Sequence, residues 1–212
     1  MVDVTDEIEN KNIENNITDN TKNTTKIRAF IALDLPIEFK KQIYNKISKI
    51  LTPKKDKLKL VESEQLHLTL FFFPSISTEK IKNLSSFIDD IKLNAFKIKI
   101  KGVNTFNLNK PSVIFIDLID ESNSITYLYN KLKDSAFENG ASRDHEDFVP
   151  HITIARIKKS ASFNDYKVIS EIIRKNQNSY FGDIICNEIK IFKSDLTPNG
   201  PIYTTLYKKV LN

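Results

Sequence analysis

Hydrophobic residues follow two periods along the chain, and these periods predict strands and helices in alternation. Runs of β-branched and aromatic residues predict strands, whereas apolar residues three and four positions apart predict helices. The expected strands cover 27–34, 67–73, 96–103, 113–118, 151–157, 184–192 and 202–210. The expected helices cover the stretch after Pro36, then 78–91 with Ser77 as its N-cap, 124–137 and 166–173, and Pro74 is expected to end the second strand. The mixture predicts an α+β protein.

Residues 1–25 differ from the rest of the chain in composition. They contain no aromatic residue, few apolar residues and many Asn, Thr and acidic residues, which predicts a disordered tail before one domain over 26–212. The tail holds six acidic and two basic residues, so the domain carries 30 Lys and Arg against 21 Asp and Glu. This excess favours a polyanion such as RNA only weakly, because a lysine-rich proteome would give the same composition.

Cysteine, glycine and the apolar runs limit the classes of function. A single cysteine, Cys186, cannot form a disulfide within the chain, so we expect a reducing compartment and a cytoplasmic location. No apolar run approaches the roughly 18 residues of a membrane span, and the N-terminus lacks the apolar core of a signal peptide. The four glycines lie far apart, which excludes a P-loop and a dinucleotide-binding turn.

Two of the three histidines, His67 and His151, begin the same frame of histidine, apolar residue, threonine and apolar residue. Composition alone would produce this pair in roughly 3 of 10,000 such chains. A helix and an extended segment follow each frame, and the intervals from His67 to Phe106 and from His151 to Phe192 are 39 and 41 residues. The layout predicts a duplication into two α+β lobes related by a pseudo-twofold axis, each contributing one frame to a shared cleft.

The spacing within each frame suits chemistry at a phosphodiester. Residues i and i+2 of a strand share a face, so His67 projects beside Thr69, and His151 beside Thr153. One neutral histidine can take a proton from a nucleophile, and the other, when charged, can give one to the leaving oxygen. The threonine hydroxyls can donate to the non-bridging oxygens, where negative charge must be held.

A structural role and a metal site are the two other interpretations of these residues. Either histidine alone would more often be a structural residue at a strand edge, but that explanation is weak for two histidines in one repeated frame. A zinc site would need more ligands than three histidines and one cysteine set far apart can supply, so no metal or other cofactor is expected. The run Asp-His-Glu-Asp at 144–147 could hold a cation, although such runs are more often solvated acidic loops.

At four places the sequence resembles the RNA 2′,3′-cyclic phosphodiesterases, also called 2′-5′ RNA ligases, within the two-histidine phosphoesterases. The matching segments read RAFIALDLP, LHLTLFFF, FVPHITIAR and GPIYTTLYKKVL, in that order, and the resemblance covers nearly all of 27–211. The resemblance implies a bilobal two-histidine phosphoesterase (LigT-like) fold, in which two antiparallel sheets flank a central cleft with helices outside. It also implies metal-free opening of a terminal 2′,3′-cyclic phosphate to a 2′-phosphate, with reversible 2′-5′ ligation as a second capacity.

The resemblance also implies a role for each matching residue. His67 matches the proton donor of the family, and His151 matches its proton acceptor. Thr69 and Thr153 match the threonines that contact the phosphate, and Arg156 matches the phosphate-binding arginine of the second motif. The implied partner is RNA with a 2′,3′-cyclic phosphate end, such as a tRNA fragment, bound by a monomer that contacts no membrane.

Strand alternation makes two further predictions around these motifs. Arg156 stands five residues after His151, so it points to the opposite face of a regular strand and reaches the phosphate only if a bulge or strand end intervenes. Phe71 and Phe73 share the parity of His67, so they are candidates to line the cleft and stack a nucleobase, the alternative being that both lie in the core.

Two alternatives to RNA-end hydrolysis remain open at this point. A two-histidine phosphoesterase could act instead on a small cyclic nucleotide or on a 2′-5′ oligonucleotide, which product analysis on defined substrates would reveal. A basic RNA-binding module could retain both frames without catalysis, in which case binding would depend on salt and no turnover would occur. The physiological RNA and the role of the tail are not specified by the sequence.

Overall fold

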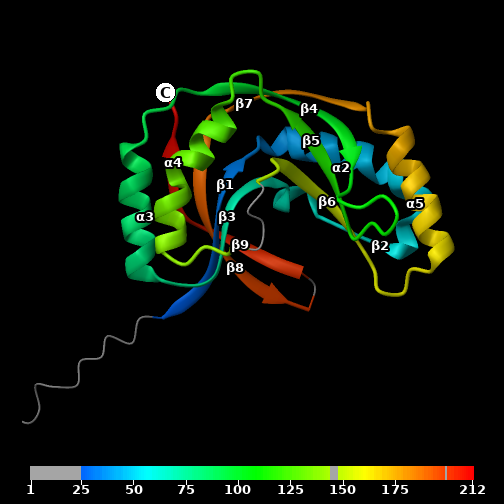
Figure 1. Cartoon of the computed structure of the whole chain (residues 1–212), viewed down its shortest axis with the longest axis horizontal. Helices are drawn as coiled ribbons and strands as arrows, with labels where there is room; N and C mark the ends of the chain where they lie inside the picture. The colour runs from blue at the N-terminus through cyan, green and yellow to red at the C-terminus, as the bar shows by residue number, and fades with distance from the viewer. Residues whose placement is uncertain (1–24, 144–147, 199) are drawn as a thin grey trace, which may run out of the picture.

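The computed structural model describes residues 25–143, 148–198 and 200–212 (Figure 1). The predicted N-terminal tail, apart from Thr25, and the acidic run at 144–147 lie outside the described residues. The strands are β1 (Lys26–Asp34), β2 (Leu58–Leu60), β3 (His67–Ser77), β4 (Phe96–Asn104), β5 (Val113–Ile119), β6 (His151–Ile157), β7 (Tyr180–Cys186), β8 (Glu188–Thr197) and β9 (Gly200–Val210). The α-helices are α2 (Ile37–Leu51), α3 (Thr78–Asp90), α4 (Ser124–Glu138) and α5 (Phe163–Lys175), and the 3₁₀ turns are η1 (Thr52–Lys57) and η2 (Ser63–Gln65).

The strands form one nine-stranded antiparallel sheet in the order β7-β4-β5-β6-β3-β1-β8-β9, with β2 paired to the far end of β6. The two sheets expected from the resemblance are therefore the two halves of a continuous sheet. The halves meet where β3 and β6, the two strands that begin with histidine, lie side by side, and one residue pair joins them. The predicted α+β architecture holds, and the site strands occupy its centre.

The order of the strands reveals how the duplication is built. Counting outward from the centre, β6-β5-β4-β7 on one side corresponds to β3-β1-β8-β9 on the other. Strand β4, which follows α3, pairs with β5 in the half that carries the second motif. Strand β8, which follows α5 and β7, pairs with β1 in the half that carries the first motif. The two lobes therefore exchange a strand, which ties them together at the centre.

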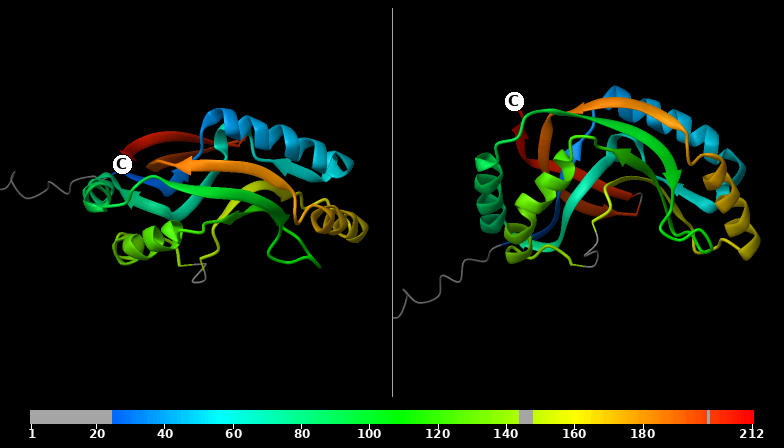
Figure 2. Two further views of the ribbon diagram at one scale, coloured as in Figure 1. Left: turned by 90° about the horizontal axis from the view of Figure 1, so that it is seen from above. Right: turned by 45° about the horizontal axis from the view of Figure 1, so that its top comes forward.

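The helices pack in two pairs at the ends of the sheet. Figures 1 and 2 show α3 beside α4 at one end and α2 and α5 at the other. Their apolar residues bury one side of the sheet in a single large core cluster. On the other side Phe30, Ala32 and Phe192 form a small separate cluster, against which Phe72 and Tyr203 pack. None of the helices in the described ranges has the length and apolar character that a bilayer-crossing helix needs.

Several element boundaries differ from the predictions for local reasons. Strand β3 does not end at Pro74 but continues to Ser77, because the pairing with β1 is irregular there and Pro74 is exposed. The expected strand 184–192 is two strands, since β7 ends at Cys186 and β8 begins at Glu188. The helix predicted at 166–173 is longer at both ends, and Ser162 caps it. The predicted cap of α3 is confirmed, since the Ser77 hydroxyl accepts a hydrogen bond from the backbone amide of Lys80.

Candidate active site

The predicted site residues meet in one pocket at the junction of the two halves of the sheet. The cavity holds about 740 Å³, which is the size of a small-ligand site. Its walls include His67 and Thr69 from β3, and His151, Thr153 and Arg156 from β6. Two stretches of chain more than eighty residues apart therefore supply both imidazoles to the same space.

The pairing of β3 with β6 sets how the two motifs face one another. Leu68 pairs with Ile152 in the antiparallel register, and these apolar side chains are fully buried on the core side. In such a register each histidine lies level with the threonine of the opposite strand. The four polar side chains therefore alternate around the centre of the pocket, two imidazoles and two hydroxyls, all on the face away from the core.

Each imidazole is oriented by a backbone carbonyl two residues earlier in the chain. The Nδ1 of His67 lies 2.6 Å from the Gln65 carbonyl oxygen, and the Nδ1 of His151 lies 2.7 Å from that of Val149. A carbonyl only accepts, so each Nδ1 carries the hydrogen and donates it. The Nε2 of each neutral ring therefore carries no hydrogen, and that of His67 lies 2.9 Å from the Thr69 hydroxyl.

The walls around His67 are aromatic. The Phe30 ring stacks on the imidazole at 4.6 Å between centroids, and Tyr203 meets it edge-on at 5.5 Å. Burial lowers the pKa of His67 to about 4, although the bond to the Gln65 carbonyl acts in the opposite direction. His67 is therefore neutral in the empty pocket at pH 7.

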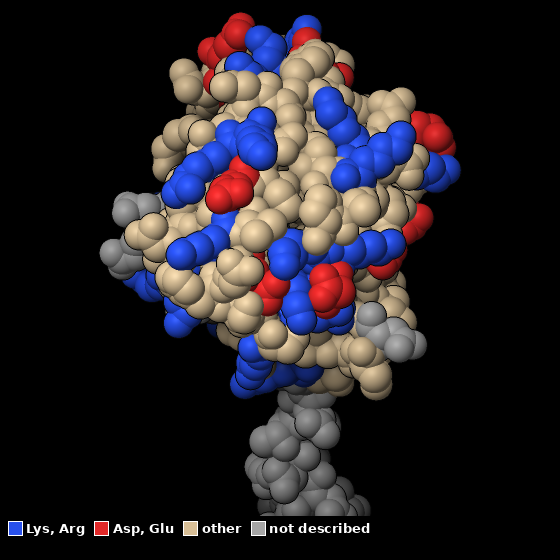
Figure 3. All heavy atoms as spheres, turned by 90° about the vertical axis from the view of Figure 1, so that its right-hand side faces the viewer, with Lys and Arg blue, Asp and Glu red and all other residues tan. Residues whose placement is uncertain are grey.

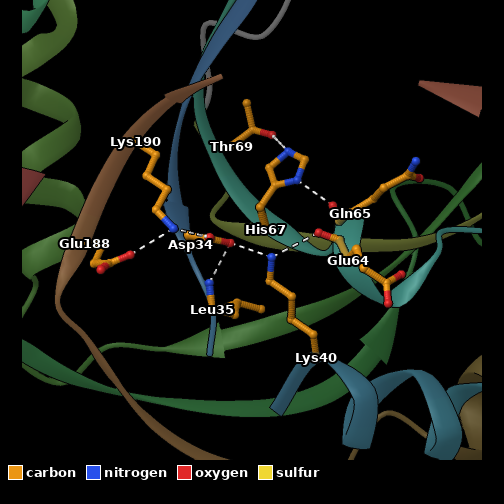
Figure 4. A network of polar contacts seen from close by, with 9 residues as sticks. All are labelled: Asp34, Leu35, Lys40, Glu64, Gln65, His67, Thr69, Glu188 and Lys190. Carbon is orange, nitrogen blue, oxygen red and sulfur yellow. Dashed lines mark hydrogen bonds and ion pairs between the residues drawn. The ribbon is translucent and has the colours of Figure 1, made fainter. Parts of the chain in front are cut away.

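A buried ion-pair network lies behind His67 (Figure 4). Asp34 accepts from Lys40 at 2.6 Å and from Lys190 at 2.7 Å. Burial raises the pKa of the Asp34 carboxyl, but the hydrogen bonds from the two lysines outweigh it, so the pKa stays below its ordinary value. Lys40 also donates to the Glu64 carbonyl at 3.1 Å, in the η2 turn that carries the acceptor for His67. The network therefore holds the turn that orients the imidazole.

His151 has similar walls on the other side of the pocket. Phe115 from β5 lies 4.9 Å from its ring, and Phe106 meets it edge-on at 5.3 Å. The two rings do not stand at equivalent positions, because Phe115 is the register partner of Thr153, whereas the residue paired with Thr69 is Ala32. Asp117 is the register partner of His151 in β5, and burial raises the pKa of its carboxyl. Each histidine is thus framed by an aromatic residue of the adjacent strand.

A bulge in β6 turns Arg156 into the pocket. Consecutive residues of β5 pair with Thr153 and Ala155, so β6 contains one extra residue between them. Ile154 and Ala155 are both buried as a result, and the alternation resumes one position late. The bulge on which the placement of Arg156 depended is present, and the guanidinium lies on the same face as His151.

A matching bulge in β3 changes the places of the three phenylalanines. Consecutive residues of β1 pair with Thr69 and Phe71, so Leu70 is the extra residue and the parity shifts after it. The expectation that Phe73 faces the cleft is wrong, because its ring is fully buried in the core. Phe71 borders the pocket but is 3% exposed, and its face stacks on Tyr129 at 4.7 Å. Phe72 instead points to the cleft side.

The pocket residues that the sequence analysis missed include two cations and a tyrosine. Arg28 on β1, Lys59 on β2 and Tyr203 on β9 all border the cavity. Arg28 and Tyr203 stand in two of the segments that carry the family resemblance, which is a signal that could have singled them out. Lys59 occurs in a lysine-rich stretch and has no such signal. Their convergence depends on strand pairing between distant parts of the chain.

Basic side chains are frequent on the surface at one end of the molecule. Figure 3 shows many Lys and Arg side chains, and fewer Asp and Glu, on the end of the molecule that carries α5. Such an excess attracts polyanions without selecting among them. In the described ranges, no three His, Cys, Asp or Glu residues gather closely enough to hold a metal ion.

Comparisons with known proteins agree with this geometry. The family model described as AKAP7 2'5' RNA ligase-like domain matches residues 30–208. A protein of Methanocaldococcus jannaschii named RNA 2′,3′-cyclic phosphodiesterase is 33% identical over 181 residues, which cover 85% of this chain and 98% of the relative. One of Aquifex aeolicus with the same name is 34% identical over 154 residues, covering 70% and 79%. The crystal structure of Escherichia coli LigT with 3′-AMP has a TM-score of 0.71 at 23% identity, covers 88% and 99%, and confirms the predicted fold.

Proposed function

This chain belongs to the family of 2′-5′ RNA ligase-like proteins and RNA 2′,3′-cyclic phosphodiesterases, and we propose that it opens the 2′,3′-cyclic phosphate at an RNA end to a 2′-phosphomonoester. The observation that carries the proposal is the meeting of two histidine–threonine pairs in one pocket with an arginine on the same face. That set provides a base, an acid and donors for the phosphoryl oxygens without a metal ion.

The two histidines divide the proton transfers between them. The Nε2 of His151 accepts a proton from a water molecule as the water oxygen attacks phosphorus. The bond from phosphorus to O3′ breaks on the opposite side, and O3′ receives a proton from the Nε2 of His67. Thr69, Thr153 and Arg156 donate to the non-bridging oxygens while negative charge accumulates there. One water is consumed, and the phosphate remains on O2′.

The acid in this reaction must acquire its proton when substrate binds. The pKa of His67 is lowered to about 4 by burial, so the empty site does not hold that proton at pH 7. A phosphodiester anion beside the imidazole favours the charged form and raises the pKa. Binding of the phosphate is therefore linked to proton uptake by His67.

The same arrangement accounts for ligation as a second capacity. A 5′-hydroxyl in place of water gives its proton to His151 and attacks the same phosphorus, and O3′ leaves as before. The product is a 2′-5′ phosphodiester. Run in reverse, with the histidines exchanging the roles of acid and base, the reaction cleaves such a bond.

Incubation with an oligoribonucleotide ending in a 2′,3′-cyclic phosphate tests the proposal. In the presence of EDTA we expect conversion to the 2′-phosphomonoester, identified by chromatography against 2′- and 3′-phosphate standards. His67→Ala and His151→Ala should each reduce turnover by about 10²–10⁴-fold. A 3′-phosphate product, loss of activity in EDTA, or full activity in either variant would reject the mechanism.

A matched pair of threonine variants separates the site from general effects of the substitution. Thr153→Ala removes a donor in the pocket and should lower kcat by about 10²-fold. Thr205→Ala removes an exposed hydroxyl on β9, outside the pocket, and should leave kcat unchanged. Equal activities of the two variants would show that the hydroxyl of Thr153 does not act on the phosphate.

A further inference from the structure

A cation and an aromatic ring stand together at the edge of the pocket on the His67 side. The Arg28 guanidinium lies over the Phe72 ring, 4.3 Å from its centroid, and both residues border the cavity. Arg28 is exposed, and it forms no ion pair with any carboxylate of the described residues. Stacking on the ring fixes the plane of the guanidinium while its donors stay available to a ligand.

The pocket holds more positive charge than one phosphate requires. Arg28, Lys59 and Arg156 border it, and none of the bordering residues in the described ranges is acidic. None of the three cations is ion-paired within those ranges. Among the described residues the site thus offers cations and no carboxylate, which suits a ligand that carries more than one phosphate.

The three cations lie on different sides of the reacting centre. Lys59 is the register partner of Arg156, so both stand on the His151 side. Arg28 belongs to β1, whose Phe30 stacks on His67. Tyr203 borders the same cavity and meets the rings of Phe30 and His67 edge-on.

The two halves of the sheet carry different residues at the equivalent position beyond the bulge. Arg156 stands five residues after His151, beyond the bulge, and the equivalent position after His67 is Phe72. Phe72 has no charge, and Arg28 of the neighbouring strand places a guanidinium above it instead. On the His151 side the cation, Arg156, belongs to the same strand as the histidine. On the His67 side the cation, Arg28, belongs to the neighbouring strand β1.

We propose that Arg28, held by Phe72, binds the phosphate that joins the terminal nucleotide to the rest of the RNA, so that the enzyme selects oligonucleotides over cyclic mononucleotides. The inference rests on the proposed function, in which His67 protonates O3′. The ribose must then lie on the His67 side, and its 5′-phosphate continues along that wall toward Arg28. A cyclic mononucleotide lacks this phosphate and gains nothing from the contact.

The test compares two substrates in the full-length protein: 2′,3′-cyclic AMP and triadenylate ending in a 2′,3′-cyclic phosphate. Arg28→Gln should lower kcat/KM for the trinucleotide about tenfold, mainly through KM, since it removes a charged hydrogen bond. The loss on cyclic AMP should be at least about fivefold smaller. Arg28→Lys, which keeps the charge, should recover part of the loss, and Lys26→Gln, an exposed cation on the same strand outside the pocket, controls for net charge.

A third substrate identifies the phosphate itself. A trinucleotide with an uncharged methylphosphonate at its last linkage should lose the same factor with the wild-type enzyme, and Arg28→Gln should then add no further loss. Equal losses on both natural substrates, no loss on either, or a trinucleotide-specific loss in Lys59→Gln alone would overturn the assignment of Arg28.

A binding measurement separates this inference from the proposed reaction. Fluorescence anisotropy with labelled triadenylate ending in a 2′-phosphate does not depend on turnover. Arg28→Gln should weaken binding and reduce the slope of log affinity against log salt by about one. An inactive wild-type protein that still shows this difference would refute the reaction and retain the site, whereas unchanged binding would refute the site.

Discussion

The ion pair between Lys40 and Asp34 provides a direct test of how the fold supports His67. Lys40 is 6% exposed on α2, donates to Asp34 at 2.6 Å, and donates to the Glu64 carbonyl in the turn before β3. Lys40→Met keeps most of the apolar stem and removes the charge and both hydrogen bonds. The substitution therefore perturbs the network of Figure 4 without opening a large cavity.

The expected cost follows from what remains after the substitution. Removing one partner of a buried ion pair typically costs about 3–5 kcal/mol, because the other charge is left without compensation. Asp34 keeps Lys190 at 2.7 Å and the backbone amide of Leu35 at 2.9 Å, so its charge stays partly compensated. We therefore expect Lys40→Met to lower the free energy of unfolding by about 1–3 kcal/mol.

The neighbouring lysine supplies the matched control. Lys41 pairs with Glu38 on the exposed face of the same helix, and both side chains are more than half exposed. Lys41→Met should change the free energy of unfolding by about 0.5 kcal/mol or less. Urea titrations followed by circular dichroism measure both variants, with equal m-values as the check that the same surface unfolds. If the two variants have the same stability, the buried network does not support the fold.

Three further tests address the pH response, the core and the backbone. In the folded protein the pKa of His67 is about 4, below its ordinary value of 6.5. Between pH 6.5 and pH 4 the unfolded chain binds a proton at His67 that the folded chain does not bind, so the free energy of unfolding falls as the pH drops through this range. Urea titrations at pH 7 and pH 5 should show a loss on the order of 1–2 kcal/mol that His67→Gln lacks; an equal pH response in both proteins would contradict the shift. Phe73→Ala should cost about 3–5 kcal/mol of unfolding free energy and Phe72→Ala about 2 or less, because only Phe73 is fully enclosed, and equal costs would argue against the bulge. Gly102→Ala should lower the unfolding free energy by about 1–3 kcal/mol, since φ is +93° and a Cβ would stand 2.8 Å from the Gln177 carbonyl oxygen; wild-type stability would refute that strain.

The arrangement of the two motifs could be predicted because its information is local. Two-residue periodicity places His67 beside Thr69, and His151 beside Thr153, in any strand that contains those frames. The repeated layout also predicted that the frames belong to equivalent parts of the fold, and in the structure their strands, β3 and β6, are neighbours at the centre of the sheet. The exchange of β4 and β8 between the halves could not be predicted, because it depends on which strands pair rather than on any one segment.

The errors of alternation share one physical cause. Regular alternation along a strand would place Phe73 in the cleft and Arg156 outside it. In the structure Phe73 lies in the core and Arg156 borders the pocket. In each strand one extra residue directly follows the threonine of the motif. It is Leu70 in β3 and Ile154 in β6. A bulge is defined against the neighbouring strand, here β1 or β5, so it cannot be recognised from the strand alone. A pair of consecutive buried residues marks each bulge once the structure is known.

The two bulges also explain how a symmetric scaffold serves an asymmetric reaction. Both halves supply an imidazole oriented by a carbonyl and a hydroxyl beside it, which are the groups that either side of a phosphorus centre requires. Beyond the bulges the halves differ, with Arg156 on one side and Phe72 under Arg28 on the other. In the proposed reaction the sides differ in the same way, because water approaches from the His151 side and the nucleoside departs on the His67 side. The imidazoles and hydroxyls, which occur in both halves, therefore match the proton transfer that each side requires in the proposed reaction. The position after each bulge, Arg156 or Phe72, differs between the halves, as the attacking water differs from the departing nucleoside.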